Sequence, residues 1–259
     1  MTPLTYTESA VALVTGARGG IGREVVARLR AGGCRVAAVG RTLHALGGLD
    51  ADAHIEADTT TPDGAMQAVK ATREYFGAAP TLLAHCVGNT LIQPLHRTKA
   101  EQYREVMTTN ADSAFYILQA FVDGLRADNG GAANASLAGA AVFVSSVVSR
   151  IGVANHEAIA AAKGAVEALA RSAAATYAAQ GLRVNVVAPG LTETPMTAGM
   201  LKLDAMREGA GKQYPLGGVQ SAGQVADVIA FLLSEQASRL TGQTIPVDGG
   251  FAAIRPLVK

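Results

Sequence analysis

The sequence predicts an α/β fold, in which helices cover both faces of a doubly wound parallel sheet in a three-layer α/β/α arrangement. Short apolar runs rich in β-branched residues alternate with longer stretches of helical periodicity along nearly the whole chain, as expected for strands joined by crossover helices. The apolar runs are continuous, which is typical of strands buried on both faces. The chain has 259 residues, 49% of them hydrophobic, and no charged or Pro/Ser-rich linker. We therefore expect a single domain spanning residues 1–259.

Strands and helices are expected in strict alternation. The predicted strands are Val11–Thr15, Arg35–Gly40, His54–Ala57, Thr81–Cys86, Ala141–Ser145, Arg183–Ala188 and Thr244–Val247. The predicted helices are Ile21–Ala31, Asp63–Tyr75, Ala100–Arg126, Ala154–Ala179 and Gln224–Ser234. In such sheets the ligand binds outside the carboxyl ends of the strands.

The segment 191–218 interrupts this alternation. We expect a short amphipathic helix in it that carries Met196, Met200, Leu201, Leu203 and Met206. An insertion after the carboxyl end of a strand is a common place for a lid, and methionine side chains adapt to varied apolar ligands. Ordinary core packing of these side chains is the alternative.

Composition excludes several classes of partner. The net charge is +1, aromatic residues make up 5% and tryptophan is absent, so the sequence has no basic or stacking surface for nucleic acid. No apolar stretch approaches about 18 residues, and no leader-like segment opens the chain. Cys34 and Cys86 lie in apolar segments without metal-ligand spacing. We expect buried thiols, no metal, no membrane partner, a small-molecule substrate and a cytoplasmic location.

A glycine-rich turn follows the first predicted strand. Its sequence is TGARGGIG (Thr15–Gly22), and a helix is predicted directly after it. Glycines at this place let backbone N–H groups and the helix N-terminus approach a pyrophosphate. The turn therefore predicts a dinucleotide site, with a simple tight turn as the alternative.

The second predicted strand ends at Gly40-Arg41, where dinucleotide folds place an acid for the ribose 2′-hydroxyl. Because no acid stands there, Arg41 and Arg18 are candidates for binding a 2′-phosphate through their guanidinium groups. The sequence thus favours NADP(H) over NAD(H), with solvated arginines as the alternative.

In order and spacing, these segments resemble the short-chain dehydrogenase/reductase family over nearly the whole chain. Thr15–Gly22 match its TGxxxGxG motif, Asp58 and Thr59 stand where its Asp–apolar pair holds the adenine, and Val187–Met196 and Gly242–Gly250 match later signatures. The resemblance implies a Rossmann-type fold and a nicotinamide cofactor. It places cofactor contacts at Gly16, Arg18, Gly19, Gly20, Ile21, Gly22, Arg41, Asp58, Thr59, Cys86, Val87, Gly88, Lys163, Pro189, Gly190, Thr192 and Thr194.

The resemblance also implies a catalytic tetrad of Asn, Ser, Tyr and Lys. Asn110 matches the asparagine that supports a proton-relay water, Ser146 the serine that holds the substrate oxygen, and Lys163 the lysine that binds the nicotinamide ribose. The position of the tyrosine, 13 residues after Ser146 and four before Lys163, is occupied by Ile159. An isoleucine side chain can neither donate nor accept a proton. The family's NNAG segment is also altered and reads His85-Cys86-Val87-Gly88.

Another group could supply the proton. On a helix, positions 156, 159 and 163 share one face, so His156 is a candidate acid on the side of Lys163. The charge of Lys163 and the helix N-terminus both disfavour a protonated imidazole there. Packing or a contact with substrate is the alternative for His156. His85 is a weaker candidate of the same kind.

Two functions remain open at this stage. The first is an NADP(H)-dependent reductase of a carbonyl or enoyl group, with an atypical active site. The second is a catalytically inactive member that binds NADP(H) as a sensor or structural subunit. For Lys163 itself, an ion pair with Glu167 one helical turn away is the alternative to cofactor binding. The segment 158–175 is rich in alanine, and members of the family commonly form oligomers. Both suggest that the protein is a homo-oligomer, either a tetramer or a dimer.

Overall fold

The computed structural model describes residues 3–8, 10–132 and 135–255. Seven parallel strands form its main sheet in the order β3-β2-β1-β4-β5-β6-β9. The strands are β1 (Val11–Thr15), β2 (Arg35–Gly40), β3 (Ala53–Glu56), β4 (Leu82–His85), β5 (Gly139–Val144), β6 (Leu182–Pro189) and β9 (Thr244–Val247). All seven coincide with predicted strands, with ends shifted by at most two residues. The predicted α/β fold class is confirmed.

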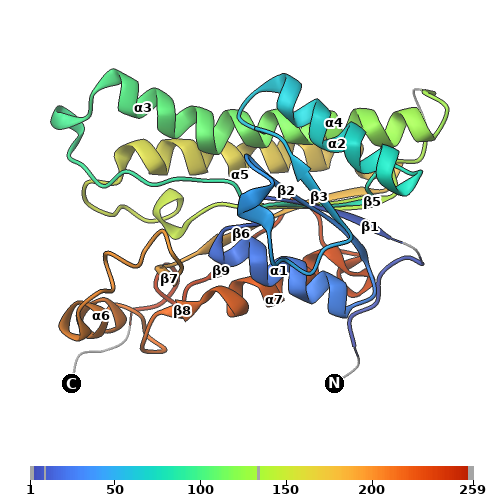
Figure 1. Cartoon of the computed structure of the whole chain (residues 1–259). Helices are drawn as coiled ribbons and strands as arrows, with labels where there is room; N and C mark the ends of the chain where they lie inside the picture. The colour runs from blue at the N-terminus through green and yellow to red at the C-terminus, as the bar shows by residue number, and fades with distance from the viewer. Residues whose placement is uncertain (1–2, 9, 133–134, 256–259) are drawn as a thin grey trace.

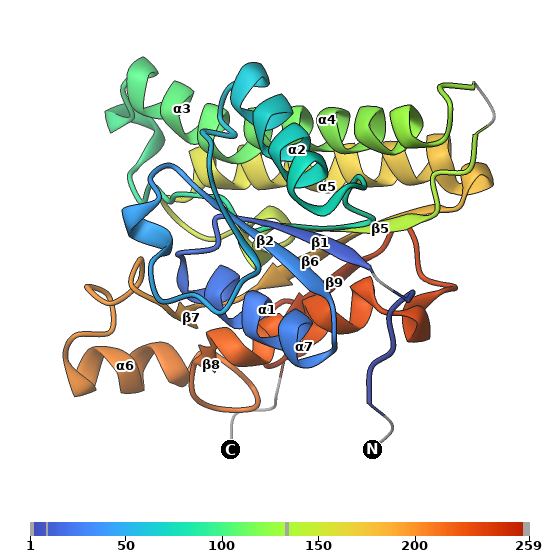
Figure 2. The ribbon, with the colours of Figure 1, turned by 45° about the vertical axis from the view of Figure 1, so that its right-hand side comes forward.

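Helices cover both faces of this sheet (Figures 1 and 2). Helices α1 (Gly20–Ala31) and α7 (Ala222–Leu233) pack together on one face, and α2 (Pro62–Phe76), α4 (Ser113–Asp128) and α5 (Glu157–Tyr177) cover the other. Within the part of the chain that the structure describes, no helix has the length and apolar character needed to cross a membrane.

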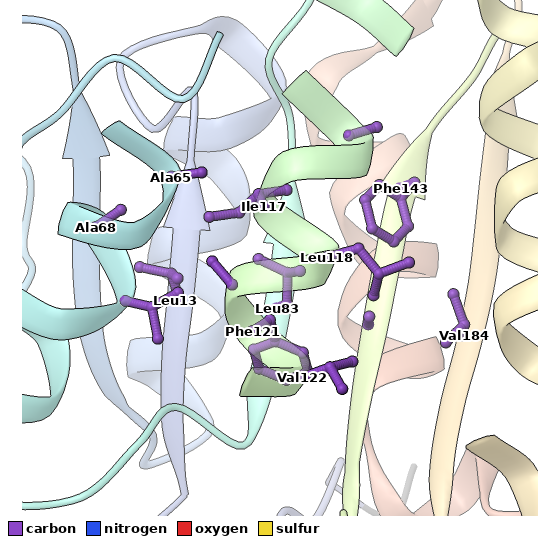
Figure 3. Packing of buried hydrophobic residues seen from close by; sticks show 14 of the residues in the cluster. Leu13, Ala65, Ala68, Leu83, Ile117, Leu118, Phe121, Val122, Phe143 and Val184 are labelled. Carbon is purple, nitrogen blue, oxygen red and sulfur yellow. The ribbon is translucent and has the colours of Figure 1, made fainter. Parts of the chain in front are cut away.

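The core lies in two apolar layers, one on each side of the sheet. Figure 3 shows the layer beneath α4, where Ile117 and Phe121 point toward side chains of the strands such as Leu13 and Leu83. Each of these four side chains is fully buried. Burying a side chain of this size contributes about 1.5–3 kcal/mol to the stability of the fold. This packing stabilises the sheet, at whose carboxyl ends the site lies.

The predicted helix 100–126 is interrupted. It consists of α3 (Ala100–Met107), a π-helical turn η3 (Thr108–Asp112) and α4. A π turn inserts one extra residue into a helix. Apolar residues still lie on the buried face of both flanking helices, so hydrophobic periodicity does not reveal the insertion. Single π turns within α-helices occur frequently at functional sites.

The segment 191–218 also differs from expectation. Strand β7 (Thr192–Glu193) pairs with β8 (Gln220–Ser221), and the helix α6 spans Asp204–Gly211. Of the five apolar residues assigned to one helix, Met206 alone lies in α6. Before α6 the Thr197 hydroxyl contacts Thr192 O and Thr194 N and folds the chain into turns. The prediction of a single amphipathic helix was therefore wrong. Leu201 is buried, as the alternative of core packing expects, whereas Met196, Leu203 and Met206 are exposed.

The order of the strands creates a crevice at the site. β1 and β4 lie side by side, with Thr15 opposite His85, yet their chains continue toward opposite edges of the sheet. The loops that follow them therefore diverge, and ligands of doubly wound sheets bind at this switch point.

Candidate active site

The glycine-rich turn lies directly at this switch point. Gly16 has φ +66°, and a Cβ on it would lie 2.7 Å from the backbone of Cys86 after β4. The N-cap of α1 is Gly19, which makes no side-chain cap, and the first turn of α1 has no acidic side chain. The positive end of α1 is thus left open for an anion, as a pyrophosphate requires. These features fit a dinucleotide.

The residues predicted for the adenosine half follow three strands: Arg18 comes after β1, Arg41 after β2, and Asp58 and Thr59 after β3. Arg18 and Arg41 are exposed, and neither pairs with a carboxylate among the described residues. Thr59 is buried, whereas Asp58 is exposed and accepts hydrogen bonds from the N–H and hydroxyl of Thr60. Guanidinium groups without a carboxylate partner have the geometry to bind a phosphate.

Lys163, Asn110 and Gly88 converge at the centre of the site. A Cβ on Gly88 would lie 2.9 Å from Asn110 Oδ1 and 3.2 Å from Lys163 Nζ, so both polar atoms lie against the same face of this glycine. Asn110 Oδ1 is buried and has no hydrogen-bond partner among the described residues. Its Nδ2 donates to Asn89 Oδ1 (2.7 Å) and Val106 O (2.9 Å). An unpartnered buried acceptor beside a buried ammonium suits a polar ligand or a water.

Lys163 does not pair with Glu167. Its Nζ donates to Val144 O at 2.8 Å, and only 6% of the residue is exposed. Burial lowers the pKa of Lys163 to about 8, while the Cys86 thiol acts in the opposite direction. Glu167 instead accepts hydrogen bonds from the Ser145 hydroxyl (2.9 Å) and the Ser149 hydroxyl (2.6 Å) and pairs with Arg150 (3.3 Å). The structure thus decides against the ion-pair alternative.

Ser146 is the N-cap of the 3₁₀ turn η4 (Val147–Ser149) and lies two residues after the end of β5. Its Oγ accepts a long hydrogen bond from Val148 N (3.4 Å), and the residue is half-buried. The hydroxyl proton has no acceptor among the described residues, so the group is free to donate to a ligand. The neighbouring contacts of Glu167 fasten this turn to α5, which carries Lys163.

Ile159 is 3% exposed and lies in an apolar cluster with Val106, Ala158 and Ala162. Leu91, Met107 and Val148 pack against the same cluster. The side chain therefore fills a hydrocarbon environment between α3, α5 and η4. It offers no proton at this position.

His156 is not part of α5, contrary to the expected start of that helix at Ala154. The helix begins at Glu157 because Asn155 adopts a left-handed conformation (φ 65°), and His156 is the N-cap. The helical geometry that predicted a face shared with Lys163 therefore does not extend to His156. Its Nδ1 donates to Ala154 O (2.7 Å), because a carbonyl can only accept, and Nε2 remains for another partner.

His85 and Cys86 lie at the end of β4. His85 is buried between Thr15 and Ser113, and burial, followed by the charge of Lys163, lowers its pKa to about 3. A ring so enclosed is not a proton donor to substrate. Cys86 is half-buried, and burial raises the pKa of its thiol to about 12. Cys34 is buried as expected.

The end of β6 closes the site from the other side. Thr194 lies over the glycine turn, since a Cβ on Gly20 would lie 2.8 Å from Thr194 Cγ2. Gly190 follows Pro189 and packs against Tyr214 and Gln220, with space for no side chain. Thr192 is buried, and its hydroxyl donates to Gly190 O (3.0 Å). The remaining predicted contacts are Ile21 and Gly22, in the first turn of α1, and Val87, two residues after β4.

Sequence reasoning missed Asn89 and Tyr214. Asn89 holds the Asn110 amide, and the Tyr214 hydroxyl accepts a hydrogen bond from Leu191 N (2.7 Å) at the start of segment 191–218. A polar residue directly after Gly88 was a usable signal for Asn89. Nothing in the local sequence indicates the Tyr214 contact, because it joins residues 23 positions apart.

Comparisons with known proteins agree with this geometry. Residues 16–252 match the protein family described as Enoyl-(Acyl carrier protein) reductase. The chain is 33% identical to the 2-(R)-hydroxypropyl-CoM dehydrogenase of Xanthobacter autotrophicus, over 95% of this chain and 100% of that protein. It is 32% identical to a 3-oxoacyl-[acyl-carrier-protein] reductase of Salmonella typhimurium, over 94% of this chain and 97% of that protein.

Solved structures are similar over the same length. A short-chain type dehydrogenase/reductase from Mycobacterium ulcerans superposes with a TM-score of 0.88 at 29% identity, over 97% of this chain and 92% of that chain. The aldohexose dehydrogenase of Thermoplasma acidophilum in ligand-free form gives a TM-score of 0.86 at 25% identity, over 97% of each chain.

Proposed function

The chain belongs to the short-chain dehydrogenase/reductase family, and we propose that it is an NADP(H)-dependent oxidoreductase that reduces a carbonyl or activated double bond of an apolar substrate. One observation carries the proposal: Lys163 Nζ and the unpartnered Asn110 Oδ1 meet at Gly88, beside the crevice that the glycine turn opens. A buried ammonium and a buried, unpartnered acceptor are groups that can hold the cofactor ribose and a water beside a substrate.

The cofactor would be held along the carboxyl ends of the strands. The open N-terminus of α1 would bind the pyrophosphate, Arg18 and Arg41 the 2′-phosphate, and Lys163 the nicotinamide ribose. When bound, NADP(H) supplies or accepts the hydride. The unpaired arginines support NADP(H) over NAD(H).

Three side chains would act on the substrate end of the crevice. The free Ser146 hydroxyl would donate to the substrate oxygen and stabilise the charge that develops on it. The Lys163 ammonium would add positive potential, and Asn110 would hold a water through its unpartnered Oδ1. Segment 191–218, which exposes Met196 and Met206, would close over an apolar substrate.

The active site would be atypical, because Ile159 stands at the position of the family's proton-donating tyrosine. The proton would come from His156 or from a water held by Asn110. Because Nδ1–H donates to Ala154 O and a neutral imidazole carries one N–H, His156 Nε2 would donate a proton only from the doubly protonated ring. The water is the simpler source, because Asn110 is the group already beside Lys163.

The apolar cluster around Ile159 favours a second candidate function. A side chain buried among Val106 and Ala162 leaves a site that could bind NADP(H) without turning it over, as a sensor or as a structural subunit. This candidate predicts cofactor affinity with no chemistry on any substrate.

Single-turnover oxidation of NADPH separates the two functions. The wild type, Ile159→Tyr and the matched control Ile159→Phe would each be mixed with ketones, β-ketoacyl thioesters and enoyl thioesters, and NADPH binding would be titrated separately. Phenylalanine controls for ring size, because it lacks only the hydroxyl.

Oxidation by the wild type would support the reductase and exclude the non-catalytic function. In that case His156→Phe tests the imidazole as the proton source, and full activity of this variant would leave the water held by Asn110 as the source. Oxidation by Ile159→Tyr alone, with NADPH bound by all three proteins, would support the non-catalytic function. Absence of NADPH binding in the wild type would refute both.

A further inference from the structure

His85 is a deeply buried ionisable side chain that the proposed reaction does not use. It ends β4, is 2% exposed, and lies against the ring of Phe143 with 5.6 Å between centroids. Its Nδ1 lies 2.7 Å from Thr15 Oγ1 and its Nε2 lies 3.0 Å from Ser113 Oγ. Both ring nitrogens thus have a partner, which simple space filling does not require.

The direction of these hydrogen bonds follows from their neighbours. Ser113 Oγ donates its single proton to Thr109 O (2.7 Å), because a carbonyl can only accept. The hydroxyl must therefore accept a proton from His85 Nε2–H. A neutral imidazole carries one N–H, so Nδ1 accepts from the Thr15 hydroxyl. The low pKa of about 3 agrees with a ring that stays neutral.

This chain of hydrogen bonds ends in the π-helical turn that carries Asn110. Ser113 N donates to Thr108 O, five residues back, as in a π-helix. In an α-helix the same N–H would donate to Thr109 O. Here the Ser113 hydroxyl satisfies that carbonyl instead. The hydroxyl, held by His85, therefore stabilises the π form of the turn over the α form.

The orientation of Asn110 depends on whether this turn is π-helical or α-helical. Each residue turns a helix by about 100°, so removing the extra residue of the π turn would rotate Asn110 relative to α3 or α4. Its Oδ1 would then no longer lie beside Lys163 Nζ at Gly88.

We propose that His85 is a positioning residue that, through Ser113, fixes the π-helical turn and holds Asn110 toward Lys163. This role rests on the proposed function, because it matters to activity only if Asn110 and Lys163 serve the reaction. Its structural part, the tautomer of His85 and its effect on Asn110, can be tested without activity.

The first test is ¹⁵N NMR of the wild type with labelled histidine. We expect the shift of His85 Nδ1 to report an unprotonated nitrogen and that of Nε2 a protonated one. A proton on Nδ1 would overturn the proposal. This measurement needs neither substrate nor turnover, so its outcome is independent of whether the chain is a reductase.

The second test compares three variants. His85→Gln keeps an N–H donor for Ser113, His85→Leu removes it, and Phe143→Leu disturbs the same packing without touching the donor. We expect His85→Leu to shift the side-chain amide signal of Asn110 and to lower kcat at least tenfold, with NADPH affinity within twofold of wild type. His85→Gln should retain kcat within about threefold.

Phe143→Leu distinguishes positioning from packing. We expect it to lower the unfolding midpoint while the Asn110 signal and kcat stay close to wild type. An unchanged Asn110 signal in His85→Leu, or an equal loss of kcat in Phe143→Leu, would overturn the proposal. If no protein turns over, the Asn110 signal still decides the structural part, and only the proposed function fails.

Discussion

Lys163 carries a buried ammonium group, and no carboxylate among the described residues pairs with it. The variant Lys163→Met should therefore change how the free energy of unfolding depends on pH. Burial lowers the pKa of the lysine from 10.5 to about 8. Each pKa unit corresponds to about 1.4 kcal/mol. The charged lysine thus destabilises the folded protein by about 3 kcal/mol below pH 8.

The sign follows from proton binding. Between the folded pKa of about 8 and the ordinary value of 10.5, the unfolded chain binds more protons than the folded one, so the free energy of unfolding rises with pH. From about pH 7 to about pH 9.5 the wild type should gain about 2 kcal/mol from this residue, and Lys163→Met should gain nothing. The lost hydrogen bond to Val144 O changes the offset between the two proteins but not this difference in slope.

Thermal or urea unfolding across this pH range measures the difference. The unfolding midpoint of the wild type should rise by about 4 °C relative to Lys163→Met. Lys70→Met is the matched control, because the side chain of Lys70 is 77% exposed on α2, and its curve should run parallel to that of the wild type. Parallel curves for Lys163→Met as well would refute the reasoning.

Three further predictions concern the cofactor, the centre of the site and assembly. Arg41→Ala should weaken NADPH binding at least tenfold by titration and leave NADH within twofold, and equal losses would contradict a 2′-phosphate contact. Gly88→Ala should lower turnover at least tenfold, because its Cβ would crowd Asn110 Oδ1 and Lys163 Nζ. In the control Gly164→Ala the new Cβ enters open space, so turnover should stay unchanged. Equal activity of both variants would argue against the site. Phe115 on α4 is 51% exposed. Light scattering after size exclusion should give the mass of a tetramer or a dimer for the wild type and a smaller mass for Phe115→Glu. A monomeric wild type would refute the expected assembly.

The sequence by itself determined the fold and the place of the switch point between β1 and β4. Continuous apolar runs place central strands such as β1 and β5, because a strand buried on both faces must be apolar at every position, whereas the edge strand β3 alternates buried and exposed residues. The glycines of Thr15–Gly22 predicted a turn whose backbone can approach a pyrophosphate, and that contact stays a prediction. In the structure Gly16 has φ +66° and lies against the backbone of Cys86 after β4. These features are local in the chain or follow from its order, so one sequence carries them.

Only the tertiary structure decided the partners of single side chains. Glu167 lies one helical turn from Lys163, but it contacts Ser145, Ser149 and Arg150, which helical spacing cannot reveal. His156 lies outside α5 because Asn155 takes a left-handed conformation. The π-helical turn that carries Asn110 is followed by Ser113, which His85 contacts from β4. Such contacts join distant parts of the chain, and their free energy is absent from any local pattern of residues.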